Sequence, residues 1–271
     1  MMIRRHLLAA AAAALLGASP ALAQAPVPPA ARAELAPTGT LRAAINYGNP
    51  VLVQRDPAGG EPRGVSPALA RALAARLGVP LTMVPFDAAG RVTEANRASG
   101  GNAWDIAFVA IDPVRSEGIA FTAPYVVIEG IYAVPIASPI RSNEEVDRAG
   151  VRISVGRGSA YDLFLTREIR NATLVRTGTS AAAISEFARD GLEVVAGVGQ
   201  PIRDFAAANP GFRALPARFM VIEQAMAVPR GRDAALAFLR DFVEEAKASG
   251  FIARALAESN QPDAAVAPAA R

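Results

Sequence analysis

The chain has 271 residues, of which 52% are hydrophobic and 20% charged, with no cysteine and a single histidine, His6. Its 28 Lys and Arg residues exceed its 25 Asp and Glu residues by three. Loss of Arg4 and Arg5 with a signal peptide would reduce that excess to one. Such a small positive charge gives no indication of nucleic-acid binding. His6 would leave with the same segment, so the mature chain would have neither His nor Cys, which excludes a Ser-His-Asp triad, a Cys nucleophile and the usual zinc ligand sets.

Residues 1–23 have the pattern of a secretory signal peptide. Arg4 and Arg5 form a charged start, residues 7–16 form an apolar run too short to span a bilayer, and Ala21-Leu22-Ala23 matches an A-x-A cleavage site. The mature protein is expected to begin near Gln24, with a retained membrane anchor as the alternative. Because there is no cysteine, the chain can be neither a lipoprotein nor cross-linked by disulfides.

Neither the segment after the signal peptide nor the last segment of the chain shows the apolar periodicity of a helix or strand. The chain between them alternates strand and helix patterns. Residues 24–38, rich in Ala and Pro, predict a flexible leader, and residues 260–271 predict a similar tail. Apolar runs at 41–45, 81–86 and 105–111 predict strands, with helices at 66–77 and 92–97. Ser66-Pro67 would cap and open the first helix, and Gly78 would end it. This order predicts a parallel sheet with helices on both faces.

Arg115 follows the third strand in an unusual position. Asp112 and Pro113 predict a helix start, which places Arg115 in the first turn of that helix. A cation is unfavourable there because the free N–H groups and the helix dipole are already positive. An anion held jointly by those N–H groups and the guanidinium would explain the arginine. A surface ion pair with Asp112 or Glu117 is the alternative.

Two longer apolar strands, at 126–134 and 225–228, enclose a second alternating series. Its strands are expected at 151–155, 174–176 and 192–196, and its helices at 159–169, 180–189 and 201–208. A long helix at 233–249 and a shorter one at 250–258 follow. This order fits a second α/β domain inserted into the first, joined to it by two crossover strands near Glu129–Val134 and Gln224–Val228.

The stretch from Trp104 to Tyr125 resembles a known family. A strand followed by Asp-Pro-x-Arg, Phe-Thr and Ala-Pro-Tyr is similar to the ligand-binding core of the family 3 bacterial extracellular solute-binding proteins, the polar amino-acid binders of ABC importers. The resemblance extends from about Gly39 to Ser259. It implies an α/β, two-lobed periplasmic-binding-protein fold of type II, each lobe a mostly parallel sheet flanked by helices. Lobe 1 would comprise residues 39–130 and 225–259, and lobe 2 residues 131–224.

The same resemblance implies a mode of action. The ligand would lie between the lobes, with its carboxylate gripped by Arg115. The protein would be a periplasmic monomer without a cofactor. Its partners would be a small anionic or zwitterionic ligand and a membrane permease.

Three turns occupy positions beyond the carboxyl ends of strands, where ligands of open α/β sheets bind: residues 110–115, 156–161 and 197–201. The family usually has Ser or Thr at the position of Ala110, so only a backbone N–H could serve there. In the second turn, Ser159 and Asp162 have capping-box spacing, so Ser159 is either a plain cap or a ligand contact. That turn lacks the G-x-x-x-x-G-K-[ST] pattern of a phosphate loop.

The third turn departs most from the family. The Asp that pairs with the α-ammonium of amino-acid ligands aligns with Val198, and the family's aromatic positions correspond to Asn49-Pro50-Val51-Leu52 and Ala88. The carboxylate partner, Arg115, is retained while the ammonium partner is not. This favours a ligand with a carboxylate or another anion, and leaves open whether it carries an α-ammonium.

Glu129 lies within an apolar crossover strand, where a charge is costly unless it is paired or faces the cleft. It is either a partner for a ligand cation or half of an ion pair with an Arg near the hinge, and the same two interpretations apply to Gln224. Trp104 is expected to be structural. No catalytic residue, cofactor or metal site is predicted. The candidate ligand-binding residues are Arg115, Ala110, Asp112, Asn49, Glu129, Gly158, Ser159, Ala160, Val198, Gln200 and Gln224.

The favoured function is that of a periplasmic receptor for an ABC importer, which closes two lobes on its ligand without catalysis. An enzyme similar to periplasmic cyclohexadienyl dehydratases is the first alternative. The missing acid at Val198 argues against it, and Glu129 keeps it open. An accessory or sensory binding protein is the second alternative, and a sensory role would need a separate signalling partner.

Overall fold

The computed structural model describes residues 26–270, so the predicted signal peptide lies outside the described residues. The first half of the chain forms α1 (Pro29–Leu35), β1 (Leu41–Asn46), α2 (Val65–Leu77), β2 (Leu81–Phe86), α3 (Ala89–Ala98), β3 (Ile106–Ala110) and β4 (Ile119–Pro135). The second half forms β5 (Arg152–Gly156), α4 (Ala160–Glu168), β6 (Thr173–Thr177), α5 (Ser180–Arg189), β7 (Val194–Val198), α6 (Gly199–Ala208), β8 (Phe212–Ala214), β9 (Met220–Pro229), α7 (Asp233–Ala248), α8 (Phe251–Glu258) and β10 (Ala265–Val266).

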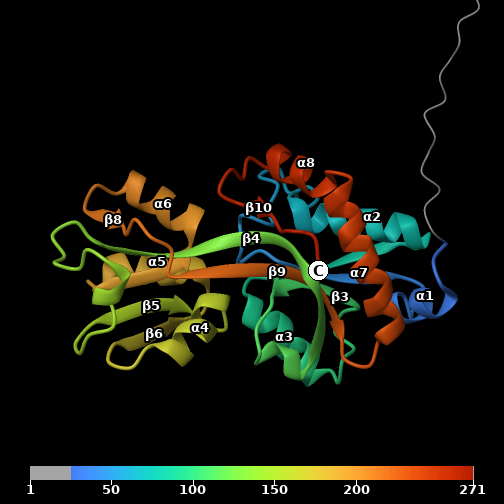
Figure 1. Cartoon of the computed structure of the whole chain (residues 1–271), viewed down its shortest axis with the longest axis horizontal. Coiled ribbons are helices and arrows are strands. Elements are labelled where there is room, and N and C mark those ends of the chain that lie inside the picture. The colour runs from blue at the N-terminus through green and yellow to red at the C-terminus, as the bar shows by residue number, and fades with distance from the viewer. Residues whose placement is uncertain (1–25, 271) are drawn as a thin grey trace, which may run out of the picture.

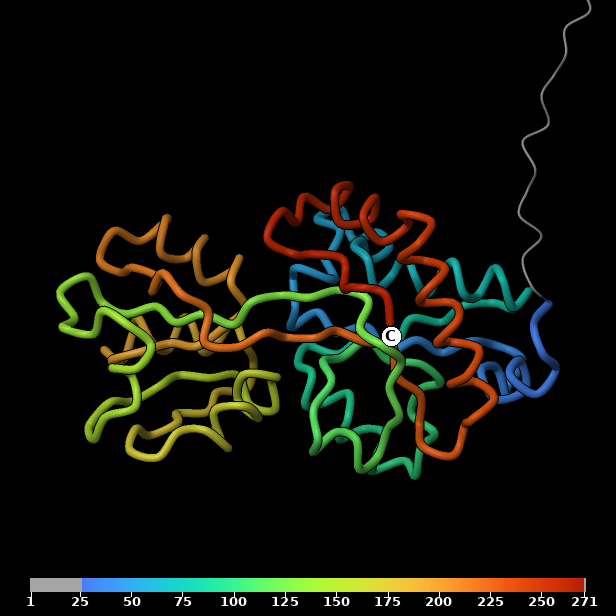
Figure 2. Tube along the Cα trace, viewed as in Figure 1, coloured from blue at the N-terminus to red at the C-terminus, as the bar shows by residue number. Residues whose placement is uncertain are grey.

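The fold is the expected α/β arrangement of two lobes. In lobe 1, β1 pairs in parallel with both β2 and β3; in lobe 2, β5 pairs in parallel with both β6 and β7. Helices α2, α3, α7 and α8 lie around the first sheet portion and α4, α5 and α6 around the second, and the chain passes between the two groups along β4 and β9 (Figures 1 and 2). Each β-α-β unit therefore directs the carboxyl ends of its parallel strands towards the connection between the lobes.

The two crossover strands hold the lobes in one hydrogen-bonded ladder. Strand β4 pairs antiparallel with β9 from Ile119↔Pro229 to Gly130↔Met220, and then continues beside β7 from Gly130↔Val198 onwards. The strand order is β2-β1-β3-β9-β4-β7-β5-β6. The parallel strands expected in each lobe are present, and the crossover strands, which pair with each other, join the two sets into one continuous sheet. The exact lobe boundaries stay a prediction.

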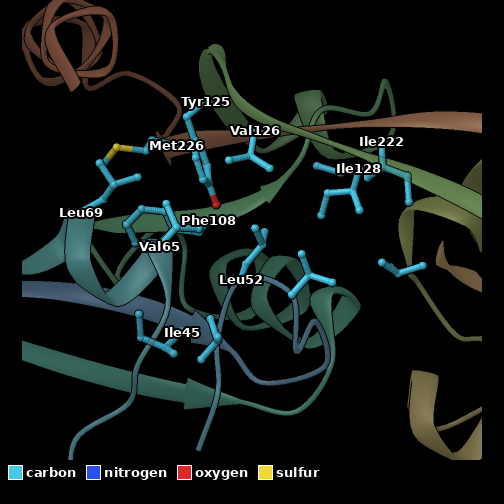
Figure 3. Packing of buried hydrophobic residues seen from close by; sticks show 14 of the residues in the cluster. Ile45, Leu52, Val65, Leu69, Phe108, Tyr125, Val126, Ile128, Ile222 and Met226 are labelled. Carbon is cyan, nitrogen blue, oxygen red and sulfur yellow. The ribbon is translucent and has the colours of Figure 1, made fainter. Parts of the chain in front are cut away.

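The apolar core also runs through this connection. In lobe 1, the rings of Phe108 and Tyr125 meet edge to face, with centroids 6.1 Å apart, close to the buried Leu69 of α2 (Figure 3). Ile128 and Ile222, both buried on the crossover strands, belong to the same cluster, which extends into lobe 2. One apolar cluster therefore continues from lobe 1 into lobe 2 along the two connecting strands.

Two local predictions in lobe 1 are wrong. Helix α2 begins two residues earlier than expected, with Gly64 at the N-cap in place of Ser66, and the hydroxyl of Ser66 instead bonds to the Tyr125 hydroxyl at 2.9 Å in the core. After β3, the chain forms only a 3-10 turn, η1 (Arg115–Glu117), in place of the predicted helix. The Asp112 carboxylate still accepts a hydrogen bond from the Val114 N–H at 2.9 Å, so the capping interaction is present although no α-helix follows it.

Within the described residues, the segments expected to be a flexible leader and tail contain regular structure that packs on other elements. Residues 29–35 form α1, which buries Ala31 and Leu35 against α7. In the tail, β10 pairs with β4 at Val126 and Val127, and Ala267 is buried. Composition predicted flexibility for both segments, but a few alanine, leucine and valine contacts with distant elements suffice to order them.

Asp105 connects three parts of lobe 1 and is completely buried. It forms ion pairs with Arg42 at 2.8 Å and with Arg232 at 2.9 Å, and accepts the Arg42 backbone N–H. The neighbouring Trp104 is buried and donates its indole N–H to the Val92 carbonyl at 3.0 Å, in agreement with its predicted structural role. The contacts of Trp104 and Asp105 fix the start of β3, the strand that leads directly to Ala110 and Arg115.

Deleting residues 262–270 should lower the free energy of unfolding by about 1–2 kcal/mol. The deletion removes several hydrogen bonds, each of which typically contributes about 0.5–1.5 kcal/mol to stability. These include the β10 pairing and the bond from Lys247 Nζ to the Pro268 carbonyl at 2.8 Å. Urea unfolding of the mature and truncated chains checks this. Asp263→Asn, which removes only the ion pair with Arg203, is the control for a purely electrostatic effect. An unchanged urea midpoint would show that the tail is not part of the fold.

Candidate ligand-binding cleft

A cavity lies between the lobes at the carboxyl ends of the parallel strands. One wall comes from the ends of β1 and β3 and the start of α3, and the other from the ends of β5 and β7 and the starts of α4 and α5. The cavity encloses about 30 Å³, which is room for roughly one or two water molecules. The lobes are therefore in a closed arrangement.

Three contacts across the cleft define that closure. Arg115 Nη2 in lobe 1 donates to the Gly158 carbonyl in lobe 2 at 2.9 Å. The Asp112 carboxylate pairs with Arg167 of α4 at 3.0 Å. At Gly90, an added Cβ would lie 3.1 Å from Gly158 Cα, so the two backbones meet where both residues lack a side chain. The absence of a Cβ on both sides is what permits this approach.

Arg115 is the central charged group of the cleft. It is only 3% exposed, its Nη1 donates to the Ala110 carbonyl at 2.7 Å, and its Nε has no partner among the described residues. Burial lowers the pKa of its guanidinium to about 10, and the Asp112 carboxylate opposes that shift. Arg115 is therefore a cation at neutral pH. The alternative of a surface ion pair with Asp112 or Glu117 is wrong, because the side chain is buried and Asp112 pairs with Arg167.

The wall from lobe 2 is formed where parallel strands give way to helices. Helices α4, α5 and α6 each begin within a few residues of the end of β5, β6 or β7, so their free N–H groups gather at one edge of the sheet. The Ser159 hydroxyl accepts the Asp162 N–H at 3.1 Å, which is the predicted cap. Ser159 also lines the cavity, so capping and ligand contact are compatible at this residue.

Hydroxyl and amide groups supply the neutral polar part of the cavity. Tyr161 donates its hydroxyl to Ser180 Oγ at 2.7 Å, and burial raises the pKa of Tyr161, so this phenol stays protonated. On the other wall, Asn49 Oδ1 is buried and has no partner among the described residues, and the Gln224 side chain is 5% exposed. These groups can orient a polar ligand but carry no charge.

Seven of the predicted ligand-binding residues line the cavity: Asn49, Ala110, Arg115, Ser159, Ala160, Val198 and Gln224. Gly158 lies beside it and contributes its carbonyl to Arg115, and Asp112 serves the closing ion pair. Gln200 bonds to Asp204 on α6 and does not line the cavity.

Glu129 is turned away from the cavity. Its carboxylate pairs with Arg218 at 3.1 Å and with Arg203 at 3.6 Å, and its side chain is 38% exposed. The structure thus supports the interpretation as an ion pair near the hinge. A cation partner for the ligand at this residue is not supported, because Glu129 is absent from the cavity wall.

Replacing Glu129 by glutamine should change ligand affinity by less than about twofold and the free energy of unfolding by less than about 1 kcal/mol, as for other exposed ion pairs. Calorimetric titration and urea unfolding check the two numbers. Arg218→Ala, which removes a partner from the same cluster, is the matched control. A tenfold loss of affinity in Glu129→Gln alone would return this residue to the binding site.

Several lining residues were not predicted as ligand contacts, among them Asn46, Arg157, Tyr161, Ser180 and Ile222. Arg157 and Tyr161 lie within the glycine-rich turn that the sequence singled out, and Ser180 begins a predicted helix, so their turn positions were available as a signal. Asn46 ends β1 and Ile222 faces the cavity from β9. Only the packing of the lobes reveals these two.

Among residues 26–270, no group of three or more His, Cys, Asp or Glu side chains is placed to hold a metal ion. Within the same range, no helix combines the length and the apolar character needed to cross a bilayer.

The fold and the cleft define a two-lobed solute-binding protein. The chain belongs to the bacterial extracellular solute-binding proteins, family 3, whose model matches residues 41–259. A search of curated proteins gives no match.

Solved structures share the fold at low sequence identity. A mutant of ArgBP from T. maritima is 22% identical, with a TM-score of 0.72, over 85% of this chain and 99% of that one. A solute receptor for L-cysteine of Neisseria gonorrhoeae is 20% identical, with a TM-score of 0.72, over 86% and 94%. The ancestral amino-acid-binding protein AncCDT-1, a precursor of cyclohexadienyl dehydratase, is 20% identical, with a TM-score of 0.69, over 84% and 98%. At this identity the likeness concerns the fold and not the ligand.

Proposed function

We propose that this protein is a periplasmic receptor that captures a small carboxylate-bearing ligand between its two lobes and presents it to the membrane permease of an ABC importer. It acts as a monomer by binding and closure, with no cofactor and no chemical step. Membership of the solute-binding family supports the general role. The relatives that bind arginine or cysteine support a small polar ligand.

The buried charge of Arg115 carries this proposal. A guanidinium that is 3% exposed, without an ion pair to a described residue, is costly unless an anion enters the cleft. Two of its donors are held by backbone carbonyls, while Nε–H and the remaining Nη hydrogens are free. Such a planar fork matches the two oxygens of a carboxylate.

Hinge closure completes the site. The lobes are connected by β4 and β9, and the contacts of Arg115 with Gly158 and of Asp112 with Arg167 form only when lobe 2 approaches lobe 1. A ligand that neutralises Arg115 stabilises the closed arrangement by its differential affinity for it. The permease would then recognise the closed, loaded receptor.

The alternative of a dehydratase lacks an acid that lines the cavity. No Asp or Glu lines the cavity, and Glu129 pairs with Arg203 and Arg218. Incubation of the mature protein with prephenate or arogenate tests this alternative directly. Formation of phenylpyruvate or phenylalanine would replace the binding proposal by an enzymatic one.

Thermal-shift screening of residues 24–271 against amino acids, keto acids and aromatic acids tests the proposal. A ligand at about a hundred times its Kd stabilises the folded state by about 2.7 kcal/mol, which raises the Tm by roughly 5–10 °C for a chain of this size. We expect such shifts only from compounds with a carboxylate or another anion. Shifts confined to neutral or cationic compounds would contradict the proposal.

A further inference from the structure

The charge inventory of the cleft is one-sided. Arg115 and Arg157 are the charged residues among those that line the cavity, and no carboxylate lines it. Arg115 comes from lobe 1, whereas Arg157 lies in the turn between β5 and α4 in lobe 2. The two walls therefore each contribute one positive charge.

The acidic groups near the cleft are already neutralised. Asp112 pairs with Arg167 at 3.0 Å and is 4% exposed. Asp162 pairs with Arg176 at 2.8 Å and also accepts the Gly158 N–H. Asp112 offsets only part of the cost of burying Arg115, because its ion pair is with Arg167, and neither carboxylate forms an ion pair with Arg115 or Arg157.

Closure brings Arg115 to the turn that carries Arg157. Arg115 Nη2 reaches the carbonyl of Gly158, the residue that follows Arg157 in the chain. A cation in a partly desolvated site is stabilised by an anion beside it. An anion with two negative groups can therefore serve a cation on each wall of the cleft.

The surroundings of Arg157 suit a second anionic group. Arg157 is exposed and lines the cavity, as do Ser180 at the start of α5 and Ala160 at the start of α4. Two helix N-termini therefore lie at this cavity, and helix N-termini favour negative charge. The Tyr161–Ser180 hydroxyl pair retains one proton that is not needed for the bond between them and can be donated to an anion.

An ammonium group has no comparable partner. The available acceptors of the cavity are neutral, such as Asn49 Oδ1, and the nearest carboxylates are held by arginines. Burying an ammonium beside two cations without a carboxylate would be strongly unfavourable. The cleft therefore selects against the zwitterion of an ordinary amino acid.

We infer that the ligand is a small dianion without an ammonium group, of the dicarboxylate class, with one carboxylate held by Arg115 and the other by Arg157 and the helix starts of lobe 2. This inference rests on the proposed function. It adds the second anionic group and Arg157 as the partner of that group.

The experiment compares acids that differ in one charge. Oxalate, malonate and succinate are titrated calorimetrically into the mature protein, each beside the monocarboxylate of the same carbon number: acetate, propionate and butyrate. Aspartate, which is succinate with an α-ammonium, is the third comparison. The variants are Arg157→Ala, Arg157→Lys and Arg170→Ala. Arg170 is an exposed arginine just beyond the far end of α4, which makes it the control for general loss of positive charge.

We expect at least one dicarboxylate to bind about tenfold or more tightly than its monocarboxylate partner, and succinate to bind more tightly than aspartate. Arg157→Ala should reduce that preference to less than about twofold, Arg157→Lys should keep part of it, and Arg170→Ala should keep all of it.

Equal binding of a monocarboxylate and its dicarboxylate, a preference that survives in Arg157→Ala, or tighter binding of aspartate would overturn the dianion inference. In each of these cases a carboxylate still binds, so the proposed function would stand. Failure of both acid series would overturn the dianion inference, and failure of every anion in the thermal-shift screen would overturn the proposed function as well.

Discussion

Replacing Arg115 by alanine should weaken binding of the carboxylate ligand by roughly thirtyfold to several thousandfold, because truncating one partner of a buried charge pair costs about 2–5 kcal/mol. The guanidinium is 3% exposed and lies in a closed cavity, where water does not screen it. The same substitution removes the bond to the Gly158 carbonyl, so part of the loss should come from weaker closure. Calorimetric titration of the identified ligand measures the effect.

Two further variants separate charge from packing at this position. Arg115→Lys should recover only part of the affinity, because an ammonium cannot form the planar fork. Arg115→Met keeps most of the volume without the charge and should bind as weakly as Arg115→Ala. Loss of the cation also relieves an unpaired buried charge, so the Tm without ligand should fall little in Arg115→Met. Wild-type affinity in a folded Arg115→Ala protein would remove Arg115 from the site.

The order of elements was the part of the fold that local sequence could predict. Apolar runs bounded by glycine and proline predicted the strands, and the β-α-β order predicted parallel pairing in each half. What failed depended on distant partners. Ser66 has the sequence of a helix cap, but Tyr125, 59 residues away, takes its hydroxyl into the core. The leader and the tail are ordered for the same reason, because α7 and β4 supply contacts that local composition does not show.

The same distinction between local sequence and distant contacts applies to the candidate site. Positions at the ends of strands, such as Ala110, Ser159 and Val198, were predictable because parallel sheets direct those ends to one edge. The sequence shows that the Glu129 carboxylate lies in an apolar strand, where an unpaired charge is unfavourable. Its ion pairs with Arg203 and Arg218 depend on how α6 and the segment before β9 pack, which the sequence does not show. The residue type predicts that a polar or charged side chain needs a partner. Only the tertiary structure identifies which residue that partner is.

Closure of the lobes depends on glycine at position 90, which makes this residue a test of whether closing is needed for tight binding. Gly90 is the second residue of α3, and a Cβ there would lie 3.1 Å from Gly158 Cα and 3.2 Å from the Arg157 carbonyl. In Gly90→Ala the opposing backbone must yield by a few tenths of an ångström. In Gly90→Val, two additional methyl groups would meet the same backbone, so full closure should be blocked.

Gly90→Val should therefore weaken ligand binding by about fivefold to 150-fold, the equivalent of an overpacking penalty of about 1–3 kcal/mol placed on the closed state. Gly90→Ala should weaken binding less. The Tm without ligand should not fall in Gly90→Ala, since alanine is favoured over glycine in a helix by up to about 1 kcal/mol. Titration gives the affinities, and small-angle scattering should show ligand-induced compaction in the wild type but not in Gly90→Val. Gly211→Val, at a site with no heavy atom within 4 Å of an added Cβ, is the matched control and should bind normally. If Gly90→Val binds and compacts as the wild type does, the contact between Gly90 and Gly158 is not part of the ligand-bound state, and the closed cleft described here does not hold the ligand.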